Sequence, residues 1–222
     1  MSETLPLFPL GTVLYPGLVL PLHIFEERYR QLVRDLLAGP EPRRFGVIAI
    51  REGRETGAHG VSSLHEVGCT ATVRQVEEHE DGRFDLVTVG TDRFRLLRLH
   101  EGRPYLCADM EPLPEQVGDE AVAGLAVHAV QDAFRGYLEA LAARGATRIS
   151  VPDLPDEPML LSYVVAASVI VEVPDKQALL AEPDAGRRLT AERSLLLRET
   201  TMLRTLPSTP APDLRYSPYS PN

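Results

Sequence analysis

The stretch "LPLFPLGTVLYPGLVLPLHIFEERYRQLV", residues 5–33, contains two apolar runs with prolines, followed by an amphipathic segment. Proline has no backbone N–H to donate to a sheet, so the run at residues 5–10 is expected to be an edge or irregular strand. A proline–glycine pair signals a turn, and a second apolar strand is expected at residues 16–22. The apolar spacing then becomes helical, which predicts a helix over residues 25–37.

The segment after this helix has the pattern of short antiparallel strands. Residues 69–78 and 84–89 flank Asp81 and Gly82, and an Asp-Gly pair between two such runs is a strong hairpin signal. Six or seven short strands at hairpin spacing predict a small closed or half-closed antiparallel barrel. Further strands are expected at 44–50, 94–100 and 105–111, a turn at 90–92, and a mobile Gly-rich loop at 51–63.

The pattern changes again after residue 116, where apolar residues follow the period of a helix. Asp175 is a plausible N-cap for the third of these helices. The end of the chain, residues 207–222, is rich in proline and is expected to be a disordered tail. Helices are expected at 121–143, 159–171, 173–181 and 187–206.

Composition restricts the classes of partner. The formal net charge of −9 and the pI of about 5.2 argue against general affinity for nucleic acid or anionic membranes. The longest apolar run, residues 159–171, is shorter than the ~20 residues that a membrane-spanning helix needs. The N-terminus lacks the features of a signal peptide, and Cys69 and Cys107 are best interpreted as buried free thiols. These observations predict a soluble, cytoplasmic protein.

Catalytic motifs are missing from the sequence. A phosphate-binding loop needs glycines followed by Gly-Lys-Ser/Thr, whereas the only lysine, Lys176, stands in "VPDKQA". A Ser-Lys peptidase dyad would need that same lysine beside a serine, and an expected helix start is a poor place for it. The acidic run at residues 77–81 lies at a hairpin tip, where solvated carboxylates are expected. We therefore predict no catalytic residues and no cofactor.

The histidines give no metal signature in the linear sequence. His65, His79 and His100 are each followed by a glutamate, but none has a second histidine four residues later, as a zinc-binding helix requires. His65 and Cys69 could share a metal, yet two ligands fall far short of a site. Surface or packing roles are expected, and no metal site is predicted.

The first 37 residues carry the most specific resemblance. The apolar-proline strand, the Pro-Gly turn and "LPLHIFEERY" resemble the opening of the Lon N-terminal domain, the substrate-binding domain of ATP-dependent Lon proteases. The segment "VGCTATVRQVEEHEDGRFDLVTVGTDRFRLL" and the helical half resemble that family as well, over about residues 5–206. The resemblance implies an α+β fold, with a PUA-like antiparallel β pseudo-barrel, one N-terminal helix and a following helical bundle.

The resemblance also implies a function. Full-length Lon proteases add an ATPase module and a Ser-Lys peptidase domain, and this sequence has the motifs of neither. We therefore expect a non-enzymatic, polypeptide-binding protein, an adaptor in protein quality control. The expected organisation is a β-domain at 1–115, a helical subdomain at 116–206 and a disordered tail at 207–222.

A docking rim is predicted on the outer face of the first helix and the proline-containing loop before it. Pre-ordered proline loops lose little entropy on binding, but a charged outer face can also serve only solubility. The loop at 51–63 is a second candidate. The residues predicted to contact polypeptide are Pro16, Gly17, Glu26, Glu27, Arg28 and Arg30.

Two other functions stay open from the sequence. One is a small-molecule-binding protein or an enzyme with a pocket between barrel and bundle, which would need convergent polar side chains there. The other is an RNA binder of the PUA-like type, which would need a one-sided arginine patch. The C-terminal helix has a row of leucines seven residues apart, Leu189, Leu196 and Leu203. It also predicts a homo-oligomer if Leu195, Met202 and Leu206 widen this apolar surface beyond what the core can bury.

Overall fold

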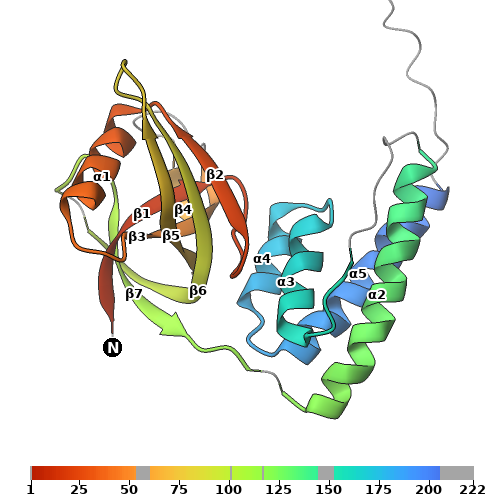
Figure 1. Cartoon of the computed structure of the whole chain (residues 1–222). Coiled ribbons are helices and arrows are strands. Elements are labelled where there is room, and N and C mark those ends of the chain that lie inside the picture. Colours follow the sequence, from red (N-terminus) through yellow and green to blue (C-terminus); the bar gives the residue numbers. More distant parts are fainter. Residues whose placement is uncertain (1, 54–60, 101, 117, 145–152, 206–222) are drawn as a thin grey trace, which may run out of the picture.

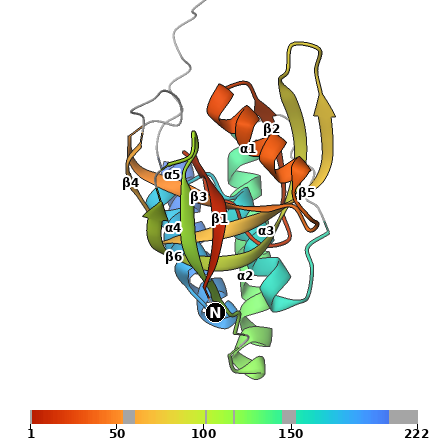
Figure 2. The same cartoon turned by 90° about the vertical axis from the view of Figure 1, so that its left-hand side faces the viewer.

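The computed structural model describes residues 2–53, 61–100, 102–116, 118–144 and 153–205 (Figure 1). The first half of the chain forms seven strands and one helix, and the second half forms four helices that lie to one side of the sheet (Figures 1 and 2). The strands are β1 (Glu3–Leu10), β2 (Val19–Ile24), β3 (Arg44–Gly53), β4 (Val61–Leu64), β5 (Val67–Glu78), β6 (Phe84–His100) and β7 (Cys107–Leu113). The helices are α1 (Glu27–Ala38), α2 (Glu120–Ala142), α3 (Pro158–Ser168), α4 (Val173–Ala181) and α5 (Ala185–Thr205).

Strand pairing closes five strands into a ring. Neighbours pair in the order β1-β7-β6-β5-β3, and β3 returns to β1 through a parallel pairing. The other pairings around this ring are antiparallel. β4 is added to β3, and β2 is added to β6. The mostly antiparallel sheet predicted from the hairpin spacing is therefore present.

β1 corrects the expectation of an edge strand. It pairs with β7 through residues 3–6 and with β3 through residues 7–10. The strand changes partner between Pro6 and Leu7, so most of its residues have a ladder on one side only. Proline has no N–H to donate, so it is tolerated where the nitrogen of the strand faces the side without a ladder. This change of partner lets a strand with two prolines lie inside the ring.

β6 corrects the expected turn at residues 90–92. The strand runs without a break from Phe84 to His100 and pairs with β2, β5 and β7 along its length. A Cβ built on Gly90 would lie 2.3 Å from the carbonyl oxygen of Tyr15. The glycine is therefore needed for close backbone packing rather than for a turn.

The Asp81-Gly82 hairpin and the opening helix follow the sequence prediction. Gly82 has a φ of 76° and joins β5 to β6. α1 packs on one end of the ring with Tyr29, Leu32 and Val33 buried (Figure 2). These side chains join a core with Phe8 and Phe45 from the strands. Burial of this apolar face stabilises the helix against the sheet.

The four C-terminal helices share a second core. α2 and α5 lie side by side along their lengths (Figure 1), and α3 and α4 fill the space between them and the strands. Leu189 and Leu196 of α5 are fully buried in this core, and Leu203 packs against it. The seven-residue leucine row is therefore core. Of the residues expected to widen the apolar surface of α5, Leu195 is buried in this core, Met202 is exposed and Leu206 lies outside the described residues. The homo-oligomer stays a prediction.

Three local expectations need correction or lie outside the described residues. Asp175 is not the N-cap of α4, because Glu172 occupies that position and Asp175 forms an ion pair with Arg198 at 2.6 Å. Residues 51–53 and 61–64 belong to β3 and β4, so the loop expected at 51–63 is shorter, and its centre lies outside the described residues. The predicted tail at 207–222 also lies outside them. The thiols of Cys69 and Cys107 are free, with Cys69 buried and Cys107 half-buried.

The strands and the helices are joined by polar contacts between buried groups. The Tyr15 hydroxyl donates to the Lys176 carbonyl at 2.9 Å, and the Gln177 side chain donates to the Val67 carbonyl at 2.7 Å. Burial lowers the pKa of Lys176. The division of the chain at residue 115 stays a prediction. Among the described residues, no helix is long and apolar enough to cross a membrane.

Candidate functional site

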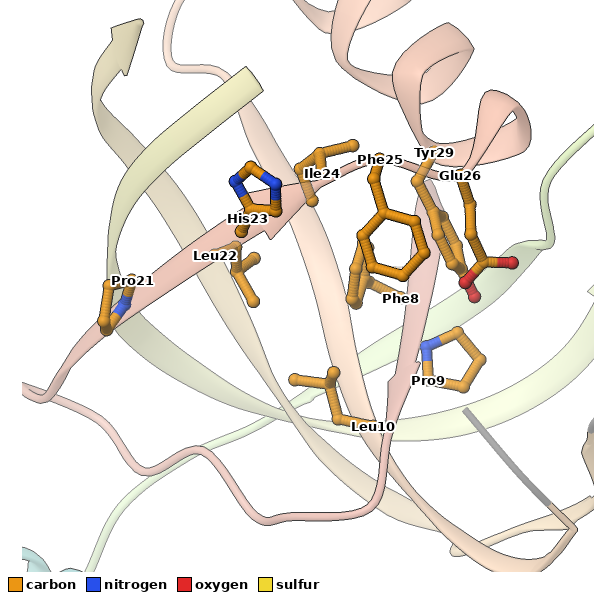
Figure 3. A pocket seen from close by; sticks show the side chains of 10 residues that line it. All are labelled: Phe8, Pro9, Leu10, Pro21, Leu22, His23, Ile24, Phe25, Glu26 and Tyr29. Carbon is orange, nitrogen blue, oxygen red and sulfur yellow. The ribbon is translucent and has the colours of Figure 1, made fainter. Parts of the chain in front are cut away.

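A groove of about 200 Å³ opens between the end of β1, the end of β2 and the start of α1 (Figure 3). Most of its lining is apolar or aromatic, with one carboxylate and one imidazole at the rim. Concave, mostly apolar surfaces with a few polar groups are the usual form of a binding site. The lining residues are Phe8, Pro9, Leu10, Pro21, Leu22, His23, Ile24, Phe25, Glu26 and Tyr29.

Aromatic rings form one wall of the groove. The rings of Phe8 and Tyr29 lie with their centroids 4.2 Å apart, and both side chains are held in the core beneath α1. Phe25 lies beside them in Figure 3, but its side chain is 54% exposed. It stands between the last residue of β2, Ile24, and the first residue of α1, Glu27. A large exposed aromatic beside an apolar groove is the usual form of a binding anchor.

β2 runs along the groove, and one of its two edges has no pairing partner among the described strands; we call this its bare edge. β2 pairs with β6 alone. The Gly90 amide donates to the Leu18 carbonyl at 2.8 Å, and hydrogen-bonded pairs alternate along an antiparallel ladder. The backbone groups of Val19, Pro21 and His23 are therefore directed away from β6. Pro21 has no N–H to leave unsatisfied there, which explains why the strand tolerates it.

Of the six residues predicted to contact polypeptide, one lines the groove. Glu26 is on its rim, and its carboxylate lies 3.1 Å from the Arg28 guanidinium. The guanidinium of Arg28 in turn lies over the Tyr29 ring, 4.5 Å from its centroid. The pair therefore borders the groove and covers one of its aromatic residues.

The other helix residues of the prediction face elsewhere. Glu27 forms ion pairs with Arg30 at 2.9 Å and with Arg34 at 3.0 Å. Arg30 also donates to the Gly82 carbonyl at 2.6 Å, which connects α1 to the β5–β6 hairpin. This contact gives Arg30 a structural role, whatever else it contacts.

Pro16 and Gly17 lie at the opposite end of β2 from the groove. Gly17 has a φ of 79°, and its amide donates to the Gly90 carbonyl at 2.9 Å. A Cβ at Gly17 would lie 3.8 Å from Leu160 of α3. The turn is thus near the helical part of the molecule, and the structure does not bring the six predicted residues together.

Sequence reasoning overlooked most of the groove. The proline-rich run at residues 5–10 and Phe25 were interpreted as strand and helix packing. Phe25 gave no such signal, because it stands four, seven and eight residues before Tyr29, Leu32 and Val33 and so falls on the apolar stripe of the expected helix. The structure begins α1 at Glu27, which leaves Phe25 outside the helix and 54% exposed.

A second cluster of charged groups lies between the strands and the helices. The Glu115 carboxylate pairs with Arg93 of β6 and with Arg188 of α5, the latter at 3.0 Å, and it accepts from the Tyr163 hydroxyl. Burial raises the pKa of Tyr163, and the Arg188 guanidinium opposes that shift. Both arginine side chains are fully buried.

The hydrogen bonds of these two arginines are directed at fixed protein groups. Arg93 also donates to the Leu180 carbonyl at 2.9 Å, and Arg188 donates to the Glu182 carbonyl at 2.7 Å and to Ser162 at 2.8 Å. Buried charges with this many partners hold elements in place. We interpret the cluster as a structural connection between strands and helices rather than a reactive site.

Comparison with known proteins identifies the family. A model of the ATP-dependent protease La (LON) substrate-binding domain matches residues 4–198. The chain belongs to the Lon substrate-binding domain family. The resemblance in the first 37 residues thus extends over nearly all of the helical half.

Full-length relatives and solved structures agree with this assignment. The chain is 29% identical over 207 residues to a Lon protease of Anaeromyxobacter dehalogenans, covering 92% of this chain and 24% of that protein. It is 25% identical over 201 residues to the Lon protease of Escherichia coli K12, covering 90% and 25%. The chain thus spans about a quarter of the length of the curated relatives it matches.

Two solved N-terminal domains have a similar fold. The Lon N-terminal domain of Mycobacterium avium complex matches with a TM-score of 0.64 at 17% identity, over 90% of this chain and 98% of that one. A Lon N-terminal domain protein from Xanthomonas campestris matches with a TM-score of 0.60 at 26% identity, over 88% and 98%. A mostly antiparallel sheet followed by helices is therefore a fold shared with Lon N-terminal domains.

Proposed function

We propose that this chain is a non-catalytic polypeptide-binding module, and that it binds an extended segment of an unfolded protein along β2. The observation that carries the proposal is the bare edge of β2 beside the apolar groove. A sheet edge can accept a further strand through main-chain hydrogen bonds, and an adjacent pocket can receive alternate side chains. This mode suits clients with varied sequences, because the backbone supplies most of the contacts.

The groove gives this mode a preference for apolar side chains. Phe25 at its rim is exposed, and Phe8, Leu10 and Leu22 supply apolar surface below it. Segments with a large apolar side chain would bury that surface, which is favourable by roughly 25 cal/mol per Å² of apolar area before the costs of association. Such segments are hidden in folded proteins and exposed in unfolded ones. Recognition of unfolded chains follows from this chemistry.

Several finer assignments belong to the same proposal. We propose that the strands form a PUA-like pseudo-barrel and the helices a separate bundle, with an adaptor role in protein quality control in the cytoplasm. The ring of paired strands and the shared core of the four helices support the first part. The family of the chain supports the second.

The proposal is tested by binding of a permanently unfolded, fluorescein-labelled polypeptide, such as a reduced and carboxymethylated protein. Phe25→Glu places a charge at the rim of the groove and is expected to weaken binding about tenfold or more, as loss of an anchoring aromatic side chain does. Leu125→Glu is the matched control, because Leu125 is 78% exposed on α2, away from β2. Its affinity should equal that of the wild type.

Either of two results would contradict the proposal. Equal loss of affinity in both variants would show that general surface hydrophobicity causes the binding. Unchanged affinity in Phe25→Glu, with the variant folded by circular dichroism, would place the binding surface elsewhere on the molecule.

A further inference from the structure

Two histidines and an aspartate from three segments meet beside the groove. His23 is on β2, Asp85 is on β6, and His79 follows the end of β5. The Nδ1 atom of His23 lies 2.6 Å from one oxygen of the Asp85 carboxylate, and Nε2 of His79 lies 2.7 Å from the other. The three groups offer ligand atoms that all lie within 4.8 Å of one another.

Strand register explains why these residues meet although they are far apart in sequence. His23 is directly opposite Asp85 in the β2–β6 pairing, and Glu77 is directly opposite Asp85 in the β5–β6 pairing. Directly opposed residues place their side chains on the same face of a sheet. His79 then turns back toward this face at the hairpin. Spacing along one segment, which gave no metal signature, could not reveal a cluster built across strands.

The local electrostatics favour a cation. Asp85 supplies a carboxylate that both imidazoles already contact. Glu77 adds a second carboxylate on the same face. Two imidazole nitrogens and a carboxylate are borderline ligands, which suit Zn²⁺, Ni²⁺ or Co²⁺ better than the oxygen-preferring Mg²⁺ or Ca²⁺.

We propose that His23, His79 and Asp85 form a binding site for a divalent transition-metal cation such as Zn²⁺. The ion would replace the protons through which the imidazoles now contact the carboxylate. Ligand atoms at ~2.0–2.1 Å from zinc lie about 3.3 Å apart in a tetrahedral site. The contacts of 2.6 and 2.7 Å between the imidazoles and Asp85 therefore have to lengthen, while ligand atoms that are farther apart, up to 4.8 Å, approach each other. His23 is exposed, and Asp85 and His79 are half-buried, with 48% of the Asp85 side chain accessible; none of the three is held in the core.

Three protein ligands leave at least one coordination position for water or another group, which is the arrangement of an open rather than a structural zinc site. His23 lines the groove as well as the cluster, so this open position is next to the groove. The metal site does not depend on the proposed polypeptide binding. Metal binding can be measured without any polypeptide present.

Arg83 gives the proposal a distinctive consequence. Its Nη1 atom lies 3.4 Å from Nε2 of His23, and its Nε atom donates to Asp81 at 2.6 Å. The guanidinium favours the tautomer of His23 that carries its proton on Nδ1, the atom that a metal needs. It also places a positive charge near the cation. Removal of Arg83 should therefore strengthen metal binding.

The test is calorimetric titration of ZnCl₂ into tag-free, chelator-treated protein, with MgCl₂ as a second titrant. One Zn²⁺ per chain is expected, with a dissociation constant on the order of micromolar for three surface ligands, and no heat of binding from Mg²⁺. His79→Gln and Asp85→Asn should each weaken binding about tenfold or more. Arg83→Gln should strengthen it about threefold.

His100→Gln is the matched control. His100 pairs with Asp109 at 2.9 Å on the far part of β6, so its removal breaks a similar His–Asp pair without touching the cluster. Its affinity for Zn²⁺ should equal that of the wild type. Thermal unfolding of each variant without metal reports whether it folds. Added Zn²⁺ should raise the Tm of the wild type and of His100→Gln, and it should leave the Tm of His79→Gln unchanged.

The proposal is overturned if the wild type takes up no Zn²⁺ at millimolar concentration. It is equally overturned if folded His79→Gln and Asp85→Asn bind Zn²⁺ as the wild type does, because the ion would then bind elsewhere, at Cys107 for example. Weaker binding by Arg83→Gln would show that Arg83 supports the site and would remove the tautomer argument.

Discussion

At the scale of single residues, the carboxylates of Glu115 and Glu192 behave in opposite ways. Glu115 has two arginines and a tyrosine as partners. Glu192 of α5 is fully buried, and neither of its oxygens has a hydrogen-bond partner within the part of the chain that the structure describes. Burial raises the pKa of Glu192 well above its ordinary value, and the Arg188 guanidinium only partly opposes the shift. A carboxyl group in this position favours its neutral form.

The raised pKa of Glu192 predicts a dependence of stability on pH. In the unfolded chain the carboxyl group ionises at its ordinary pKa, whereas in the folded protein it holds its proton to higher pH. Its contribution to stability is therefore fully present below the ordinary pKa and is lost as the pH rises toward the folded pKa. Glu192→Gln cannot ionise and should not show this loss.

Chemical denaturation at several pH values measures this effect. Between pH 5 and pH 8, the free energy of unfolding of Glu192→Gln should rise relative to that of the wild type. A constant difference between the two proteins across this range would contradict the prediction, because it would mean that Glu192 has the same pKa in both states.

Gly90 carries a second prediction at this scale. A Cβ there would meet the backbone of Tyr15 at 2.3 Å, and backbone cannot rotate away as a side chain can. Gly90→Ala should lower the free energy of unfolding by about 1–3 kcal/mol, the usual cost of overpacking. Gly124→Ala in α2 is the control, since nothing lies within 4 Å of its Cβ position, and it should stabilise the protein by up to about 1 kcal/mol. Equal Tm shifts in both variants would contradict this account.

At the scale of elements, the sequence predicted what depends on local pattern. The Asp81-Gly82 hairpin and α4 at residues 173–181 were predicted from turn chemistry and apolar period, and both are present. Pro6 predicted an edge or irregular strand for β1, and Gly90 predicted a turn within β6. In the structure, a change of strand partner accommodates Pro6, and close packing against Tyr15 requires Gly90. Tertiary pairing decides such positions, and a single sequence does not contain it.

In the candidate site too, local pattern predicted some residues, and tertiary pairing determined the others. Glu26 was predicted from its place on the outer face of α1, and it lines the groove. Phe8 and Leu22 were not predicted, because they reach the groove only when β1 and β2 are brought together. His23 and Asp85 meet through strand register, which no spacing rule along the chain reports. Sites assembled across strands are the part of function that sequence pattern conveys least.

The contact between α1 and the hairpin predicts local rather than global change. Arg30 is the link, through its hydrogen bond to the Gly82 carbonyl. Arg30→Met keeps most of the unbranched apolar stem and removes the guanidinium with its donors. We expect faster amide hydrogen exchange at the tips of β5 and β6, with a loss of about 1 kcal/mol or less in global stability. Unchanged exchange at the hairpin would show that Arg30 does not anchor it.

At the scale of the whole molecule, strands and helices are joined through Glu115. The arginines that it pairs come from β6 and α5, so one carboxylate connects both halves. Removal of one partner from a buried ionic cluster leaves the others without compensation, at a cost of roughly 3–5 kcal/mol. Cooperativity between the two halves should therefore depend on this residue.

Calorimetry of Glu115→Ala tests that coupling. The wild type is expected to unfold in one transition, and the variant at a lower temperature in two, one for each half of the chain. Glu111→Ala is the control, because its ion pair with Arg95 is solvent-exposed. A single unshifted transition in Glu115→Ala would contradict the proposed connection.

The central claim is that an unfolded polypeptide binds along the bare edge of β2, and backbone amide exchange tests it most directly. The amides of Val19 and His23 face away from β6, so a bound segment that adds a strand would hydrogen-bond to them. Addition of a saturating unfolded polypeptide should slow exchange at these two amides, and Phe25→Glu should remove the effect. Binding that leaves both amides unchanged while it slows exchange on α2 or α5 would contradict the account and place the site on the helices.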